Sequence, residues 1–128
     1  MRRLLDTHAL IRYYQTDPKL SAPARTLIED PANDVLISSA SYWEVAFKLG
    51  TQQPLLQVPF AAFVQEAIFD NGFKILPIEP RHCDRLTTLP FHHKDPFDRL
   101  LIAQALAEGI PLVSADTALD PDGDTRIW

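Results

Sequence analysis

The chain contains a single cysteine, Cys83, among its 128 residues. One thiol cannot form a disulfide within the chain, and it cannot supply a zinc site built from several cysteines. Cysteine usage therefore gives no indication of an oxidising compartment.

The sequence also lacks any apolar run that approaches the ~18 residues needed to span a bilayer. Near the amino end, Asp6 interrupts the apolar residues that follow Arg2 and Arg3 before the apolar region of a signal peptide can develop. We therefore expect a cytoplasmic protein that does not associate with a membrane.

Basic residues are scarce relative to acidic ones, with 12 Lys and Arg against 17 Asp and Glu and a formal net charge of −5. This balance argues against a protein that holds nucleic acid on a broad basic surface. The argument weakens if several acids cluster around divalent cations, because bound ions present positive charge to phosphates. The positions of the acids therefore matter more than their sum.

Apolar residues are plentiful enough for a folded core. The hydrophobic fraction of 46% and the charged fraction of 23% are ordinary for a globular protein. No repeat, low-complexity tract or linker divides the chain, so we expect one domain spanning residues 1–128.

Short apolar runs alternate with amphipathic stretches along the whole chain. The runs predict strands at 3–5, 35–38, 74–78, 112–114 and 125–128. The stretches between them predict helices after His8, from Ser21 to before Asp30, from about Ser41 to Gly50, at 60–71, at 80–86 and at 95–108. Strands that alternate with helices indicate an α/β protein, a three-layer α/β/α sandwich with a central parallel sheet of four to five strands.

Acidic residues lie where predicted strands end and helices begin: Asp6, Glu44, Asp95, Asp98 and Asp116. In an open parallel sheet, ligands bind at this edge. Asp6 and Asp116 directly follow buried strands, where acids are disfavoured unless something satisfies them. The joint pattern favours a functional site.

Structural interpretations of some of these acids stay open. Ser41 and Glu44 have the spacing of a capping box, and Glu44 precedes Lys48 by four residues, as in a helix-surface ion pair. Asp95 and Asp98 make a favourable helix start on their own.

Converging carboxylates repel one another. A pair ~5 Å apart at an effective dielectric constant of ~20 costs roughly 3 kcal/mol, so such a site needs protons or cations. Oxygen ligands select hard ions, and we therefore expect Mg²⁺ or Mn²⁺. Zinc is disfavoured, because the side chains of the adjacent His92 and His93 diverge. The acidic segment 120–124 resembles a calcium-binding loop, but its glycine is at the wrong position, so we expect a tight turn there.

Four segments resemble PIN domains, in particular the VapC-like ribonuclease toxins of type II toxin–antitoxin pairs. These segments are 4–8, 39–48, 95–105 and 112–116, and they occur in the family's order over nearly the whole chain. The resemblance implies a PIN-like fold with the first strand central in the sheet. It also implies a metal-dependent endoribonuclease that hydrolyses RNA phosphodiester bonds, with Mg²⁺ or Mn²⁺ as cofactor and a cognate antitoxin as partner.

By motif position, the resemblance assigns the catalytic and metal-binding roles to Asp6, Glu44, Asp98 and Asp116. Asp95 is either a further metal ligand or a helix cap.

Supporting roles follow from the same match. Thr7 and Ser114 would orient metal ligands or water, while Lys48 and Arg99 would contact phosphate or form surface ion pairs.

Several aromatic residues are expected at the surface, and we interpret them as contacts with a second copy in a homodimer or with the antitoxin. They are Tyr13, Tyr14, Phe69 and Phe73.

Two alternative functions remain. A receiver-type phospho-acceptor switch has a similar length and a similar sheet. Such a module needs an acid pair after the first strand and a lysine after the last core strand. Residues 6–8 lack the acid pair, and residues 114–116 lack the lysine. An inactive PIN-fold interaction protein is the other alternative, and the presence of all four carboxylates argues against it.

Overall fold

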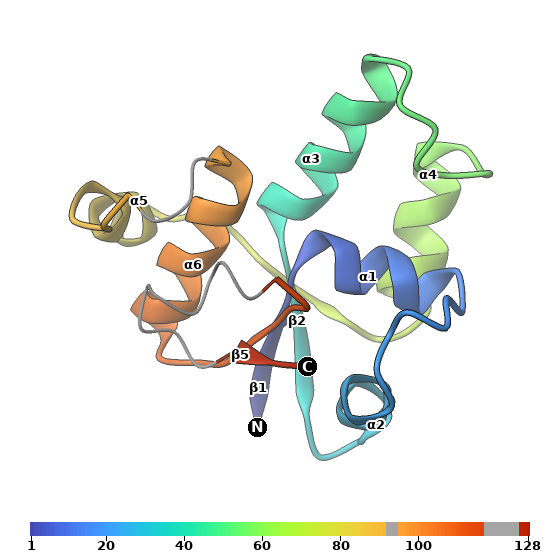
Figure 1. Cartoon of the computed structure of the whole chain (residues 1–128), viewed down its shortest axis with the longest axis horizontal. Coiled ribbons are helices and arrows are strands. Elements are labelled where there is room, and N and C mark those ends of the chain that lie inside the picture. Colours follow the sequence, from blue (N-terminus) through green and yellow to red (C-terminus); the bar gives the residue numbers. More distant parts are fainter. Residues whose placement is uncertain (92–94, 117–125) are drawn as a thin grey trace.

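A parallel sheet forms the centre of the computed structural model, which describes residues 1–91, 95–116 and 126–128 (Figure 1). Its strands are β1 (Arg2–Leu5), β2 (Asp34–Ser38), β3 (Lys74–Leu76), β4 (Leu112–Val113) and β5 (Arg126–Ile127). They lie in the order β3-β2-β1-β4-β5, and every neighbouring pair is parallel. The predicted parallel sheet, with the first strand at its centre, is confirmed.

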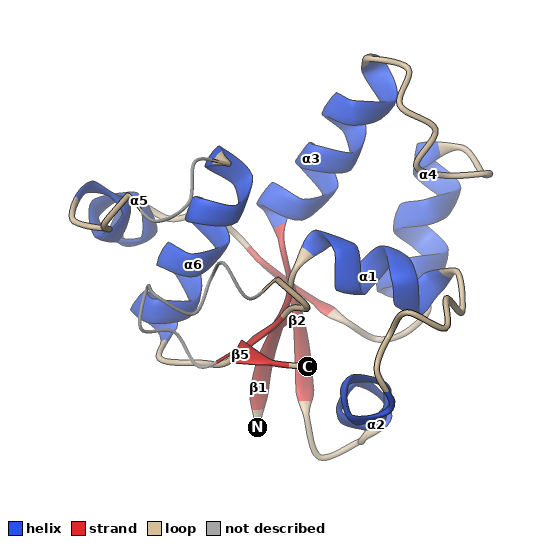
Figure 2. Cartoon of the chain, in the orientation of Figure 1, coloured by secondary structure: helices blue, strands red, loops and turns tan. Residues whose placement is uncertain are grey.

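Helices cover both faces of this sheet (Figure 2). They are α1 (Thr7–Tyr14), α2 (Ala22–Glu29), α3 (Ser39–Gly50), α4 (Phe60–Phe63), the π-helix η1 (Val64–Phe69), α5 (Pro80–Thr87) and α6 (Pro96–Glu108). Helices α1 to η1 pack on one face, and α5 and α6 pack on the other. In the described ranges, no helix combines the length and apolar character needed to cross a membrane.

Neighbouring residues of each central strand enter different cores because successive side chains point to opposite faces. Leu5 and Ile37 belong to the core under α1, α2, α3 and η1, whereas Leu4 and Leu36 belong to the core under α5 and α6. This arrangement explains the continuous apolar runs of the strands, which are buried on both sides. The three-layer α/β/α sandwich is confirmed.

The chain changes direction across the sheet at β1. From β1 it proceeds through β2 to β3, and it then returns to the other side of β1 to form β4. The carboxyl ends of β1 and β4 therefore form a topological switch point, where open α/β sheets bind ligands. Receiver-type modules have the order β2-β1-β3-β4-β5 instead, so the receiver alternative is wrong.

Helix ends follow the predicted local signals in most places. Ser21 caps α2 by accepting a hydrogen bond from the backbone N–H of Ala24, and Asp95 caps α6. Gly109 ends α6 in the left-handed conformation, with φ of 66° and ψ of 37°.

Helix α3 begins earlier than its sequence pattern predicts. Its N-cap is Ser38, the last residue of β2, whose Oγ accepts from the N–H of Ala40 at 3.0 Å. The predicted capping box of Ser41 and Glu44 is therefore wrong, because both residues lie inside the helix. This shift leaves the Glu44 side chain without a capping role.

The segment predicted as one helix at 60–71 contains a π-helical turn. The N–H of Asp70 donates to the carbonyl of Gln65, five residues earlier, at 2.8 Å. Phe73, predicted at the surface, is only 8% exposed and packs in the core with the residues of η1, so that prediction is wrong. Phe69 is 53% exposed.

Replacing Gly109 by alanine tests the left-handed end of α6. A Cβ there meets no atom within 4 Å, so the only expected cost is strain of the left-handed backbone. We expect the free energy of unfolding, measured by urea denaturation, to fall by about 1 kcal/mol. Gly50→Ala is the matched control, because its Cβ also meets nothing and its φ is not positive. We expect Gly50→Ala to be neutral or stabilising, and equal destabilisation by both variants would contradict this interpretation.

Candidate active site

Asp6 lies at the carboxyl end of the central strand. Its backbone N–H donates to the carbonyl of Val113 at 3.0 Å, which places it beside the end of β4. Its Oδ1 accepts from the N–H of Ala9 at 2.7 Å, so the same side chain caps α1. Only 6% of Asp6 is exposed. Asp6 is therefore a buried acid at the switch point of the sheet.

Burial raises the pKa of Asp6 above its usual value. Hydrogen bonds from Ser114 and Ala9 oppose this effect, as do the positive charges of His8 and Arg12. Desolvation is the largest contribution. The ionised form of Asp6 is thus destabilised in the chain alone, and a nearby cation would relieve that cost.

Glu44 projects from α3 into the same region and is 2% exposed. Its Oε1 accepts from the Thr7 hydroxyl at 2.8 Å, and its Oε2 accepts from the Lys48 ammonium at 2.6 Å. The hydroxyls of Thr7 and Ser41 lie 3.1 Å apart. Both oxygens of this buried carboxylate are therefore oriented by partners, and the residue that follows Asp6 supplies one of them.

Asp98 stands in the first turn of α6 and is half-buried. Asp95 precedes it as the N-cap, with Oδ1 accepting from the N–H groups of Phe97 and Asp98 at 2.9 and 3.1 Å. The Phe97 ring lies 5.2 Å from that of Trp43, the neighbour of Glu44 in sequence. This contact brings the first turn of α6 beside α3.

Asp116 follows β4 and is exposed. Its backbone N–H donates to the Ser114 Oγ at 3.0 Å. Because Ser114 also hydrogen-bonds Asp6, one hydroxyl connects the segment of Asp116 to the buried acid.

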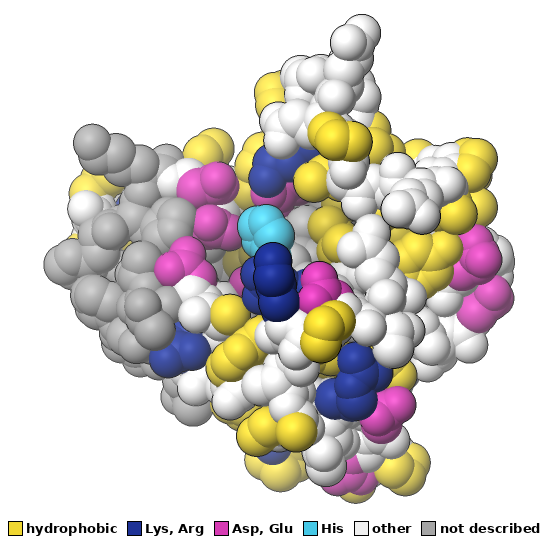
Figure 3. Space-filling model, turned by 45° about the vertical axis from the view of Figure 1, so that its right-hand side comes forward, with side chains coloured by type: hydrophobic (Ala, Val, Ile, Leu, Met, Phe, Trp, Pro, Cys, Tyr) yellow, Lys and Arg dark blue, Asp and Glu magenta, His cyan; other side chains and the backbone are white. Residues whose placement is uncertain are grey.

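These contacts bring the four predicted segments to one edge of the sheet. Figure 3 shows Asp and Glu side chains close to a histidine and to basic side chains near the middle of one face. The catalytic and metal-binding roles of Asp6, Glu44, Asp98 and Asp116 remain predictions. The histidines at 92 and 93 and the acidic turn at 120–124 lie outside the described residues.

Arg99 has a defined structural environment. Its guanidinium donates to the carbonyls of Pro90 and Leu89 at 3.0 and 3.2 Å and lies 3.9 Å from the centre of the Phe91 ring. It is 8% exposed. Arg99 therefore holds the segment before α6, and its contact with phosphate remains a prediction.

Two residues near the acids were missed by sequence reasoning. Ser41, which was assigned only as a cap, is buried against Thr7, and Arg12 acts electrostatically on Asp6. The i, i+4 spacing of His8 and Arg12 on α1 was the available signal for the latter.

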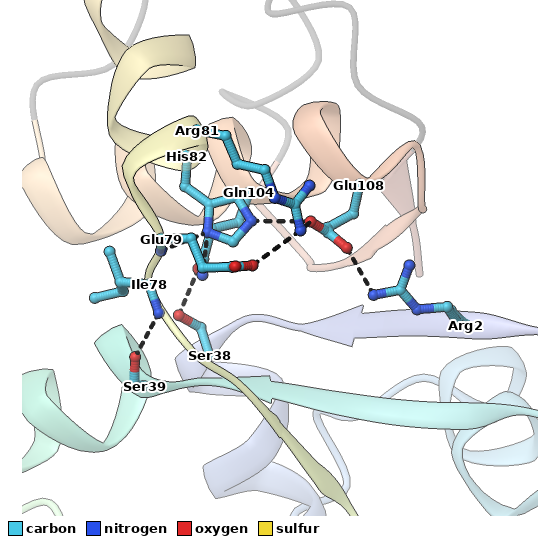
Figure 4. A network of polar contacts seen from close by, with 9 residues as sticks. All are labelled: Arg2, Ser38, Ser39, Ile78, Glu79, Arg81, His82, Gln104 and Glu108. Carbon is cyan, nitrogen blue, oxygen red and sulfur yellow. Dashed lines mark hydrogen bonds and ion pairs between the residues drawn. The ribbon is translucent and has the colours of Figure 1, made fainter.

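A separate cluster of potential metal ligands joins the start of α5 to the end of α6 (Figure 4). Within the described parts of the chain, the ligand atoms of Glu79, His82 and Glu108 come within 4.8 Å of one another. Glu108, however, already accepts from Arg2 at 2.8 Å and from His82 Nε2 at 2.9 Å, and it also pairs with Arg81. Its negative charge is compensated by side chains, so this cluster does not require a cation.

These partners determine the ionisation of Glu108. Burial acts to raise its pKa, but hydrogen bonds from His82 and Arg2 and the charges of Arg81 and Arg2 outweigh burial and hold the pKa at about 2.

Comparisons with known proteins give matches over most of the chain. The family model described as the PIN domain matches residues 3–120. The chain is 27% identical to "Ribonuclease VapC22" of Mycobacterium tuberculosis over 117 residues, which cover 91% of this chain and 88% of that protein.

Solved structures share the fold at lower identity. VapBC2 from Rickettsia felis, bound to a DNA fragment from its promoter, matches with a TM-score of 0.74 and 16% identity over 99% of this chain and 98% of that one. VapBC-1 from nontypeable Haemophilus influenzae matches with a TM-score of 0.70 and 15% identity over 99% and 97%. FitAcB from Neisseria gonorrhoeae matches with a TM-score of 0.67 and 16% identity over 98% and 96%.

Asp6→Asn should stabilise the metal-free protein at pH 7. Because the folded-state pKa is raised above 3.8, ionised Asp6 destabilises the fold as pH rises past that value, and asparagine removes the charge. The gain, measured by thermal unfolding in chelator, should shrink as pH falls toward 3.8. Asp34→Asn, at an exposed acid 3.3 Å from Lys74, is the control and should change little. A loss of stability in Asp6→Asn at pH 7 would contradict the desolvation argument.

Glu108→Gln should destabilise the protein at neutral pH by removing charged hydrogen bonds. The pKa of Glu108 is lowered from 4.5 to about 2, so its contribution is present above 4.5 and is lost as pH falls through about 2. In urea titrations, the difference in unfolding free energy between Glu108→Gln and the natural chain should therefore become smaller as the pH falls from 4.5 to about 2. Asp84→Asn, an exposed acid on α5, should show no such narrowing. A pH-independent difference for Glu108→Gln would refute the assignment.

Proposed function

The chain belongs to the PIN domain family, whose model matches residues 3–120, and on this basis we propose that it is a Mg²⁺- or Mn²⁺-dependent endoribonuclease. The observation that carries the proposal is the buried Asp6 at the switch point, with the end of β4 beside it and Glu44 of α3 bonded to the adjacent Thr7. The similarity to a protein named as a VapC ribonuclease supports the same activity.

The donor set fits a hard divalent cation. Asp6, Glu44, Asp98 and Asp116 offer carboxylate oxygens, which Mg²⁺ and Mn²⁺ prefer. Burial raises the pKa of Asp6, a cost that a cation would offset, whereas Glu44 is already paired with Lys48. In this proposal the four carboxylates hold the ion, and Asp95 acts as the helix cap that sets the first turn of α6.

Each supporting residue has a defined task in the proposed reaction. A bound cation would activate a water molecule and stabilise charge on the attacked phosphate. Thr7 fixes the orientation of the Glu44 carboxylate, and Ser114 orients Asp6. Lys48 pairs with Glu44 at the edge of the site, from which it would reach a phosphate. None of these steps requires a side-chain nucleophile.

The net charge of −5 is compatible with an RNA substrate under this proposal. The chain does not hold RNA by overall charge, because its acids exceed its bases. Attraction for the phosphate backbone arises at the cation and the nearby basic groups. Recognition of a particular RNA then depends on loop shape around the site.

We further propose that the protein is a cytoplasmic toxin paired with a cognate antitoxin, and that it forms a homodimer. The similar solved structures include toxin–antitoxin complexes named VapBC. Exposed aromatic side chains offer apolar surface for such partners, since Trp43, Phe47 and Phe69 are 58%, 55% and 53% exposed.

The proposal predicts RNA cleavage by the purified protein in Mg²⁺ or Mn²⁺ that stops on chelation. Asp6→Asn and Asp98→Asn should each lower kcat/KM by about 100-fold or more, because each removes a charged oxygen ligand. Asp34→Asn, at an acid on the opposite end of β2, is the matched control and should retain activity. Cleavage that persists in chelator and in both variants would refute the proposal, and well-folded protein without cleavage of any RNA would favour the inactive alternative.

A further inference from the structure

A line of buried polar side chains crosses the interior between the N-terminus of α3, the middle of α6 and α5. Its members are Ser38, Gln104, His82 and Glu108, and Figure 4 shows them in contact. The first three are completely inaccessible to solvent. Buried polar groups destabilise a core unless hydrogen bonds satisfy them, and each of these groups has such partners.

The direction of the hydrogen bonds in this polar line is determined at both ends. Ser38 Oγ accepts from the N–H of Ala40, so its own proton is available to donate to Gln104 Oε1 at 2.5 Å. The Gln104 amide therefore presents its NH₂ group to His82 Nδ1, at 3.4 Å.

The histidine continues the same direction. The backbone N–H of Glu79 donates to His82 Nδ1 at 3.0 Å, so Nδ1 carries no proton. Neutral His82 must then carry its proton on Nε2, which donates to Glu108 Oε2 at 2.9 Å. Every donor in the polar line thus faces an acceptor in one order, from Ser38 to Glu108.

This order also argues against a metal ion bound by Glu79, His82 and Glu108. An ion on Nε2 would require the proton to move to Nδ1, where it would oppose the N–H of Glu79. Glu108 is in addition paired with Arg2 and Arg81. The polar line is a self-sufficient set of hydrogen bonds and ion pairs.

The elements joined by the polar line carry two of the proposed ligands. Ser38 is the N-cap of α3, the helix that bears Glu44. Gln104 and Glu108 lie on α6, the helix that bears Asp98 in its first turn. The bond from Ser38 to Gln104 therefore fixes the height and rotation of α6 against the start of α3.

We infer that Gln104 and His82 are positioning residues, which act through this polar line to set the Asp98 carboxylate against that of Glu44. This inference rests on the proposed function, because it concerns the same metal site. Helix packing by apolar contacts alone tolerates small sliding and rotation, whereas directional hydrogen bonds select one register. Small displacements of ligands or reacting groups lower affinity and rate strongly.

The experiment compares two kinds of substitution. The first removes a hydrogen bond of the polar line, and the second changes a similar buried or helix-capping residue outside the polar line. Gln104→Met keeps a similar volume but removes both amide contacts, and Ile102→Val, at a buried site on the same helix, is its control. Ser38→Ala removes the other end, and Ser21→Ala deletes the equivalent cap of α2 as its control.

The first readout is Mn²⁺ affinity measured by calorimetry on the full chain. Gln104→Met and Ser38→Ala should each weaken binding about tenfold, whereas both controls should stay within about twofold of the natural chain. In RNA cleavage, kcat should fall by a similar factor while KM for RNA changes less than about twofold, because the polar line does not touch RNA. Unchanged Mn²⁺ affinity in Gln104→Met and Ser38→Ala, or equal weakening in the controls, would overturn the inference.

The second readout is the imidazole ¹⁵N spectrum of His82, which reports its tautomer without any metal or RNA. We expect the proton on Nε2, and a proton on Nδ1 would overturn the inference while leaving the proposed function intact. Failure of the proposed function has a different signature, in which the natural chain and Asp6→Asn bind Mn²⁺ equally or not at all. That result would remove the basis of the inference as well.

Discussion

The structure depends on one constraint, which is the burial of an acidic side chain at the carboxyl end of the central strand. Asp6 lies between the ends of β2 and β4 because β1 has both strands as neighbours. The chain cannot bury this group ionised without compensation, and desolvation accordingly raises its pKa. In the proposed function, Glu44, Asp98 and Asp116 would add further negative charge at the same edge and increase the need for a cation. The proposed divalent cation would offset this cost when it binds.

Local hydrogen bonds orient the carboxylates of Asp6 and Glu44. Asp6 is held by the N–H of Ala9 and by Ser114, and Glu44 is held by Thr7 and Lys48. Two of these partners, Ser114 for Asp6 and Thr7 for Glu44, are distant in sequence, so these two contacts depend on the fold. In the proposed metal site, such preorganisation would reduce the entropy lost when the ligands gather around an ion.

The sequence was sufficient for the elements of the fold, whereas the assignment of the four acids to one site stays a prediction. Runs such as 35–38 predict buried strands, and Asp95 and Gly109 mark the ends of α6, because these signals are local. The start of α3 at Ser38 and the burial of Phe73 were not predicted, because each depends on tertiary packing. The contact of Gln104 with Ser38 spans 66 residues and breaks no local pattern, so no signal in the sequence reveals it.

The molecule thus contains two kinds of acid, one whose negative charge is paired with basic side chains and one for which we propose that a cation supplies the positive charge. Glu108 is paired with Arg2 and Arg81 and accepts a hydrogen bond from His82, whereas Asp6 is a buried acid whose pKa is raised by desolvation. Anomalous diffraction from crystals soaked in Mn²⁺ separates the two groups most directly. The account predicts a manganese peak coordinated by Asp6 together with at least one of Glu44, Asp98 and Asp116. A peak at Glu79, His82 and Glu108 instead, or none beside Asp6 at saturating Mn²⁺, would contradict it.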